Sequence, residues 1–345
     1  MATGPAAITA QEQPLLAAAR AGDEEAFRRL VEPYRGELHA HCYRMLGSVH
    51  DAEDAMQDAS LRAWRGLGKF EGRSSLRSWL YTITTNTTLN LIGRRPKRVL
   101  PIDYGPAADP HGGPGVPVVE SVWMEPYADD ALGLKDGLAG PEARYEQRES
   151  VELAFIAALQ HLPARQRAVL ILREVLGFSA REVAETLDTT TASVNSALQR
   201  ARAAVDERLP ERSQQATLRA LGDDGLREIV DGFVEAWERG DVEAVTALLA
   251  EDAALAMPPR ATWFRGLDAC RIFLAERALA RRSRLVRAHA NGQVAFATYL
   301  WDPERECFEG HVLQVLTLRG DRIAEVTAFV EPALVAQFGL PATLR

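Results

Sequence analysis

Five polar side chains recur at helical spacing in the second half of the sequence, and their types suit hydrogen bonds to DNA bases. They are Thr191, Asn195, Ser196, Gln199 and Arg200. Spacings of three and four residues bring side chains to one face of a helix. Asn and Gln can pair with the edge of adenine and Arg with that of guanine, so this face predicts contacts in the DNA major groove.

A helix-turn-helix from Ser179 to Ala204 would position this face. Ser179 and Glu182 have the spacing of a capping box, which predicts that the first helix begins at Ser179. The turn contains Asp188, where glycine would fit most easily, and Thr190 is the expected cap of the second helix. The same pattern fits an ordinary helical hairpin, so the spacing alone leaves both interpretations open.

The charge of the chain is unevenly distributed. The net charge of −8 argues against nucleic-acid binding if it is spread evenly, because DNA affinity comes largely from Lys and Arg. Residues 62–98, however, contain nine basic residues and one acidic residue, whereas residues 99–149 contain three basic and ten acidic residues. Residues 161–212 have a net charge of only +1, from eight basic and seven acidic residues, so the helix-turn-helix alone should bind DNA weakly.

Composition indicates a globular protein of two or three domains. The chain has 345 residues, of which 47% are hydrophobic. The three cysteines, Cys42, Cys270 and Cys307, lie far apart, so we expect neither a disulfide framework nor a metal site, and no cofactor. No apolar run reaches the length of a membrane helix, and the first residues lack a signal pattern. We therefore expect a cytoplasmic protein that does not bind membranes.

Periodicity and breakers divide the chain into four segments. We expect two all-α domains, a helical bundle and the helix-turn-helix, followed by an α+β domain, with the boundaries 10–95 (helical), 96–141 (acidic linker rich in Pro and Gly), 142–210 (helix-turn-helix) and 224–340 (α+β). In the first segment, Gly72, Ser74 and Ser75 precede a helix expected from Leu76 to Ile92. In the last, Asn291-Gly292 and Gly320-Asp321 predict β-hairpin turns.

Two of these segments resemble a known family. Residues 51–90, DAEDAMQDASLRAWRGLGKFEGRSSLRSWLYTITTNTTLN, followed by Arg94 and Arg95, resemble the second conserved region of bacterial sigma-70 family sigma factors of the extracytoplasmic-function (ECF) type. Residues 162–202, LPARQRAVLILREVLGFSAREVAETLDTTTASVNSALQRAR, resemble their fourth region. The resemblance implies a protein that binds core RNA polymerase, recognises the −35 and −10 promoter elements and melts DNA.

The resemblance also implies roles for particular residues. Those expected to bind the clamp helices of the polymerase β′ subunit are Asp51, Glu53, Asp54, Gln57 and Asp58. Those expected at the −10 element are Lys69, Phe70, Ile83, Asn86, Asn90, Arg94 and Arg95. Those expected to face the −35 element are Thr191, Asn195, Ser196, Gln199 and Arg200, on a domain expected to contact the β flap. From the residues alone, the acidic stretch also fits a solvated helix face, and Phe70 and Ile83 also fit a hydrophobic core.

The position of the acidic linker between the two DNA-binding segments suggests a further hypothesis. In the family, the segment at this position threads the active-site channel of the polymerase. Carboxylates in residues 105–130 would mimic nucleic acid there. An unstructured segment of this length is uncommon within a compact domain, so we expect a true linker.

The last segment resembles the SnoaL-like fold, which is also called ketosteroid-isomerase-like. This fold curls a sheet around a helix and leaves a conical pocket, for which the expected lining residues are Trp263, His289, Tyr299 and His311. Acid-base chemistry would draw on these and on Asp252, Arg265, Glu309 and Glu325, but no pair has diagnostic spacing. We expect a regulatory domain that packs on the other domains or polymerase and senses a small-molecule ligand, and an anti-sigma factor is a further candidate partner.

Two other classes of protein remain as alternatives. A helix-turn-helix regulator that acts without polymerase would explain residues 179–204 but leaves residues 51–90 without a role. A fusion protein whose SnoaL-like domain is a small-molecule isomerase or hydrolase would make the chain an enzyme. We expect a sigma factor that is not itself an enzyme.

Overall fold

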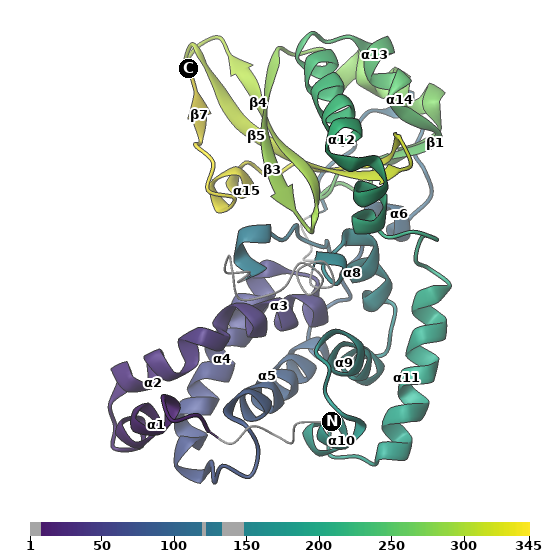
Figure 1. The fold of residues 1–345 in the computed structure, drawn as a ribbon. Coiled ribbons are helices and arrows are strands. Elements are labelled where there is room, and N and C mark those ends of the chain that lie inside the picture. The colour runs from purple at the N-terminus through teal and green to yellow at the C-terminus, as the bar shows by residue number, and fades with distance from the viewer. Residues whose placement is uncertain (1–7, 119–121, 133–147) are drawn as a thin grey trace. The chain divides into compact units, whose positions relative to one another are not determined.

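The computed structural model describes residues 8–118, 122–132 and 148–345 (Figure 1). The chain forms two compact units. The helical unit comprises residues 1–97, 130–150 and 154–208. The C-terminal unit comprises residues 98–129, 151–153 and 209–345. Within the described ranges, no helix is long and apolar enough to cross a membrane.

The helical unit contains two groups of helices. The first group is α1 (Glu12–Arg20), α2 (Glu24–Val31), α3 (Arg35–Leu46), α4 (Val49–Gly66) and α5 (Leu76–Ile92). The second group is α8 (Leu153–Gln160), α9 (Ala164–Leu170), α10 (Ala180–Thr186) and α11 (Thr191–Asp206). Leu153, the first residue of α8, belongs to the C-terminal unit. A π-helical turn at Ile171–Val175 extends α9.

Local sequence signals set the starts of α4 and α5. The Ser48 hydroxyl accepts a hydrogen bond from the backbone N–H of Asp51 and caps α4. Alanines spaced three and four residues apart are buried along one side of α4, which lets neighbouring helices approach closely. Ser75 caps α5 in the same way, so the predicted helix from Leu76 to Ile92 is confirmed.

The helix-turn-helix forms as the sequence predicts. Ser179 and Glu182 make both hydrogen bonds of a capping box at the start of α10. The Thr190 hydroxyl accepts from the backbone N–H of Ser193 and caps α11. Between the two helices, Asp188 adopts a left-handed backbone with φ of 48°, which Asp tolerates better than most residues.

The C-terminal unit is built on a curved sheet. Its strands are β1 (Leu249–Ala256), β2 (Trp263–Arg265), β3 (Ser283–Ala290), β4 (Gln293–Asp302), β5 (Cys307–Arg319), β6 (Arg322–Phe329) and β7 (Thr343–Leu344). The strand order is β2-β1-β6-β5-β4-β3, with β7 paired to β5. The β1–β6 pair is parallel and the other pairs are antiparallel. Both predicted hairpin turns are confirmed, because positive φ angles occur at Asn291, Gly292 and Gly320.

Helices cover one face of this sheet (Figure 1). They are α12 (Gln214–Glu238), which is interrupted at Gly222, α13 (Val242–Ala247) and α14 (Leu267–Phe273). A last helix, α15 (Pro332–Gln337), follows β6. Aromatic side chains fill the space between the helices and the sheet, among them Phe233, Trp237, Phe264 and Phe296. The predicted α+β domain with a curled sheet is therefore confirmed.

Much of the predicted linker belongs to the C-terminal unit. The described residues 98–118 and 122–129 include the single-turn helix α6 (Pro101–Tyr104) and pack with the sheet. Ile102 contacts the apolar cluster of Ala254, Ala256 and Trp263, and Ala108 packs against the main core. The first part of the expected linker, where it is described, is thus an ordered strap on the C-terminal unit, whereas residues 119–121 and 133–141 lie outside the described part of the chain.

Candidate nucleic-acid and polymerase interface

The predicted base-reading face of α11 is available to solvent. All five residues expected at the −35 element are exposed: Thr191, Asn195, Ser196, Gln199 and Arg200. Val194, Leu198 and Ala201 are buried on the other side of the same helix. The structure therefore brings the five polar side chains together on a surface that could enter a major groove.

Two residues expected at the −10 element occupy different environments. Lys69 is exposed at the end of a 3₁₀ turn, Leu67–Lys69. Phe70 is buried, and its ring lies 4.9 Å from the ring of Trp79. In this conformation Phe70 is part of the hydrophobic core, so its ring would have to move before an unstacked base could reach it.

The polar face of α5 contacts the helix-turn-helix within the helical unit. Asn86 donates a hydrogen bond from Nδ2 to the carbonyl oxygen of Thr186, at 3.3 Å, and the Thr82 and Thr186 hydroxyls lie 3.1 Å apart. Ile83 is half-buried on this helix, whereas Asn90 is exposed at its end. Asn86 therefore makes one hydrogen bond to α10, although the residue is exposed at the surface.

The acidic stretch on α4 has one buried member. Asp51 is 5% exposed and forms an ion pair with Arg95, which also donates to the Asp54 carboxylate at 2.8 Å. The remaining predicted polymerase-binding residues are exposed: Glu53, Asp54, Gln57 and Asp58. Arg94 is also exposed. Asp51 and Arg95, which the sequence assigned to different partners, thus neutralise each other here.

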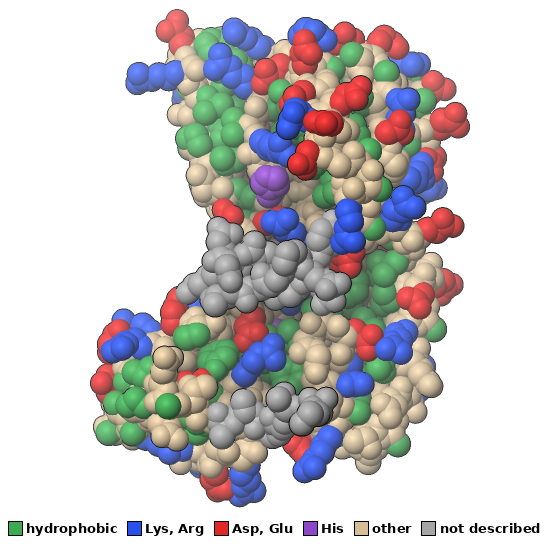
Figure 2. Space-filling model, in the orientation of Figure 1, with side chains coloured by type: hydrophobic (Ala, Val, Ile, Leu, Met, Phe, Trp, Pro, Cys, Tyr) green, Lys and Arg blue, Asp and Glu red, His purple; other side chains and the backbone are tan. Residues whose placement is uncertain are grey.

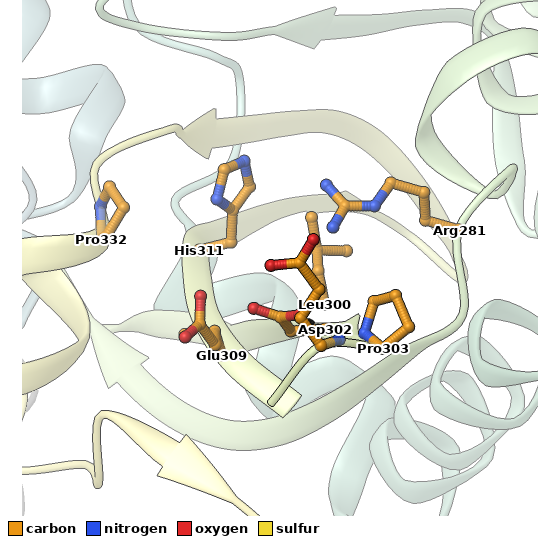
Figure 3. A pocket seen from close by; sticks show the side chains of 9 residues that line it. Arg281, Leu300, Asp302, Pro303, Glu309, His311 and Pro332 are labelled. Carbon is orange, nitrogen blue, oxygen red and sulfur yellow. Dashed lines mark hydrogen bonds between the residues drawn. The ribbon is translucent and has the colours of Figure 1, made fainter. Parts of the chain in front are cut away.

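The four residues expected to line a ligand pocket do not converge. The Trp263 indole N–H donates to the carbonyl oxygen of Gly105, and the buried Tyr299 hydroxyl donates to that of Pro341, each at 2.8 Å. His289 is exposed on the edge strand β3. Only His311 of the four lines the cavity shown in Figure 3.

That cavity lies at one end of strands β4 and β5 and is polar. Its lining residues are Arg281, Leu300, Asp302, Pro303, Glu304, Glu309, Gly310, His311 and Pro332. His311 occupies a β-bulge, because Thr298 pairs with Val312 while Tyr299 pairs with Gly310. Burial and the nearby Arg281 and Arg260 lower the pKa of His311, which favours the neutral form of its ring.

Other acid-base residues of this unit are engaged in ion pairs or in packing. Asp252 accepts hydrogen bonds from Arg319, and Glu309 accepts from Arg305. On the face seen in Figure 2, acidic and basic side chains of the C-terminal unit are mixed and do not form a patch of one sign. No group of three or more His, Cys, Asp or Glu side chains suited to a metal ion occurs among the described residues.

Glu325 gives the C-terminal unit a predictable pH dependence. Burial raises the pKa of its carboxyl group, and the nearby Asp103 raises it further, against a hydrogen bond from Thr327 that lowers it. A carboxyl with a raised pKa in the folded state contributes stability at low pH, which is lost as pH rises through that pKa. We expect Glu325→Gln to raise Tm by roughly 2 °C or more at pH 7.

The gain should disappear at about pH 4, where the wild-type carboxyl is already protonated. Thermal denaturation of both chains at the two pH values measures it. Glu306→Gln, at an exposed hairpin position, is the matched control and should change Tm equally little at both. A Tm gain for Glu325→Gln that is the same at both pH values would contradict the assignment.

The fold and the exposed faces define a class of protein. A helical module with acidic and basic residues, a helix-turn-helix and a C-terminal α+β domain together describe a multidomain DNA-binding transcription protein. Comparison with known families gives matches in the same order: Sigma-70 region 2 over residues 30–98, Sigma-70 region 4 over residues 152–205 and a SnoaL-like domain over residues 230–326.

Individual relatives agree with these matches. The chain is 41% identical over 332 residues to the ECF RNA polymerase sigma factor SigG of Mycobacterium tuberculosis, covering 94% of this chain and 86% of the relative. It is 33% identical to the RNA polymerase sigma-H factor of Pseudomonas aeruginosa, over 58% of this chain and 94% of that protein. The crystal structure of the ECF sigma factor SigJ of Mycobacterium tuberculosis has a similar fold, with a TM-score of 0.54 and 20% identity over 89% of this chain and 97% of that one.

The chain therefore belongs to the ECF family of RNA polymerase sigma factors, as the sequence resemblance predicted. It carries a C-terminal SnoaL-like domain, which was also predicted.

Proposed function

We propose that this sigma factor binds core RNA polymerase through the exposed residues of α4 and reads promoter DNA through α5 and α11. The observation that carries the proposal is the α11 surface, where all five predicted base-reading residues are exposed behind a well-capped turn. Glu53, Asp54 and Asp58 supply exposed carboxylates for a basic partner surface, which favours rapid and specific association.

Contacts within the helical unit support a need for polymerase before DNA is engaged. Asn86 on α5, although exposed, donates a hydrogen bond to the Thr186 carbonyl on α10, and this bond would have to break before Asn86 Nδ2 could pair with a base. Arg95 is held by Asp51 and Asp54. In this proposal polymerase binding competes for the acidic residues, releases Arg95 and separates α5 from α10. Without polymerase, the free chain would bind promoters weakly.

The C-terminal domain is proposed to regulate this cycle rather than to catalyse a reaction. The space between its helices and its sheet is filled by Phe233, Trp237, Phe264 and Phe296, so the inner face of the sheet is hydrophobic core. Its outer surface holds residues 98–129, the first part of the segment between the two DNA-binding regions. By holding that strap, the domain would control when the segment becomes available to polymerase.

Run-off transcription with purified core polymerase tests the proposal. Wild-type chain should direct a specific transcript, and the double charge reversal Asp54→Lys, Asp58→Lys should lower its yield at least about tenfold at subsaturating chain, since like charges would face a basic surface. Glu71→Lys is the control, because Glu71 is exposed and lies outside the acidic stretch. Its yield should stay within about twofold of wild type.

A chain that ends at Leu209 tests regulation in the same reactions. The proposal expects its transcript yield to differ from that of the full chain. No specific transcript from the full chain would contradict the sigma-factor function, and equal yields from full and shortened chains would contradict only the regulatory role.

A further inference from the structure

Residues 105–118 form a part of the strap on the C-terminal domain that is rich in proline and glycine. The sequence is GPAADPHGGPGVPV, with prolines at 106, 110, 114 and 117. Among these residues the structure has one short 3₁₀ turn, Pro110–Gly112. Gly113 and Gly115 have φ angles of 76° and 62°, so the segment is an irregular loop. Its prolines fix φ and limit the conformations of the free segment.

The C-terminal domain binds this segment through its backbone. The Trp263 indole N–H donates to the carbonyl oxygen of Gly105 and the Thr262 hydroxyl to that of Pro114, both at 2.8 Å. The backbone N–H of Ala108 donates to the carbonyl oxygen of Trp263, also at 2.8 Å. None of these bonds uses a side chain of the strap.

The same pattern continues toward the end of the segment. Arg260 donates from Nε to the carbonyl oxygen of Gly115 at 3.3 Å, and Val118 donates from its backbone N–H to the carbonyl oxygen of Pro259 at 2.9 Å. Pro117 and Arg260 also form an antiparallel β-bridge. Residues 259–263 thus present several hydrogen-bonding groups to the backbone of the strap.

Backbone recognition of this kind selects conformation more than sequence. Prolines limit the conformations of an unbound segment, so it loses less conformational entropy when it binds. Trp263 supplies both an aromatic ring and an N–H donor, and Arg260 and Thr262 supply two further donors. Beside Pro110, a shallow cavity lined by Arg265 and Leu267 leaves room for a larger side chain than proline.

We propose that residues 259–263 form a binding site for a segment of a partner protein that is rich in proline and glycine, and that residues 105–118 occupy this site in the free chain. The inference goes beyond the proposed function, because it makes the SnoaL-like domain a peptide-binding module. A tethered segment acts at a high effective concentration, so a partner must compete with the strap. Partner binding would release the strap.

Gly115 offers a way to empty the site in the full chain. Its φ is +62°, and a Cβ atom there would lie 2.8 Å from the Thr262 hydroxyl oxygen. Gly115→Val therefore combines backbone strain with a clash that also displaces the Thr262 hydrogen bond. Gly105→Ala is the matched control, because no atom lies within 4 Å of its Cβ position and its carbonyl group is retained.

The test is fluorescence anisotropy with a fluorescein-labelled free peptide of residues 104–118. We expect Gly115→Val to bind the peptide at least about tenfold more tightly than wild type or Gly105→Ala. Adding Trp263→Phe to Gly115→Val should return binding to the wild-type level, because the indole N–H is lost while an aromatic ring remains. A peptide with its prolines changed to alanine should bind at least about fivefold more weakly, because the free peptide would be more flexible.

Each outcome of these binding measurements either supports or overturns the proposed site. Circular dichroism confirms that each chain is folded, and Gly115→Ala, which has the same clash with less bulk, replaces Gly115→Val if the latter is not. Equal peptide binding by all folded variants would overturn the site. Equal binding of the alanine-substituted peptide would overturn the proline-rich class of ligand. Neither result would affect the run-off assay, so the proposed function is tested separately.

Discussion

Alanine at both Asn195 and Arg200 is expected to lower promoter-specific run-off transcription roughly 100-fold or more. Both side chains are exposed on α11, one and a half turns apart, where they could contact neighbouring base pairs. A good contact to a base edge contributes about 1–3 kcal/mol of discrimination, and separate contacts are roughly additive. The measurement is the initial rate of specific transcript formation at fixed salt and fixed core polymerase.

Ala203→Ser is the matched control for this pair. Ala203 is exposed on α11, outside the five base-reading residues, and serine adds one hydroxyl. Its rate should stay within about twofold of wild type, as is usual for surface positions. Affinity for core polymerase should also be unchanged in the double variant, since α4 is untouched. Specific transcription at the wild-type rate by the double variant would remove α11 as the reading helix.

Features that depend on neighbouring residues could be predicted from the sequence. The capping box of Ser179 and Glu182, the cap at Thr190 and the hairpin turn at Asn291-Gly292 are all present. Each depends on hydrogen bonds or backbone angles within about four residues. The exposure of the base-reading residues could be predicted as well, because burial of Val194 and Leu198 fixes which side of α11 faces solvent.

Contacts between distant residues could not be predicted in this way. Arg95 lies 41 residues from Asp54 and pairs with it and with Asp51. No local pattern distinguishes an arginine that binds phosphate from one that pairs with a carboxylate, because both roles need the same exposed guanidinium. The acidic side chains of α4 could be identified in the sequence, but the burial of Asp51 depends on how α4 packs against its neighbours.

The strap is a second example of contacts between distant residues that the sequence does not reveal. Its hydrogen bonds to residues 259–263 use strap backbone, which every sequence possesses, so its composition gave no sign of where it binds. Irregular periodicity and many prolines predicted a linker, yet such a segment can be ordered once a domain supplies donors to its carbonyl groups. Trp263 was predicted to line a pocket, and its indole N–H instead holds Gly105.

Replacing Glu152 with alanine is expected to destabilise the C-terminal unit by about 3 kcal/mol. The Glu152 carboxylate is 4% exposed and accepts hydrogen bonds from the backbone N–H groups of Gln214 and Gln215, at 3.0 and 2.9 Å. These are the first residues of α12, where a negative charge also favours the helix dipole. Alanine would leave two buried donors without this acceptor, and a bond to a charged group contributes about 1.5–3 kcal/mol.

Glu211→Ala is the control, since Glu211 is exposed three residues before α12 and should change stability by less than about 0.5 kcal/mol. Urea denaturation followed by tryptophan fluorescence measures both, because Trp237 and Trp263 lie in this unit. Glu152→Gln should fall between them, as its amide oxygen can still accept but carries no charge. A loss of stability no greater than that of Glu211→Ala would show that the carboxylate does not hold the start of α12. The intermediate value matters most, because it separates the charge of Glu152 from its hydrogen-bonding geometry.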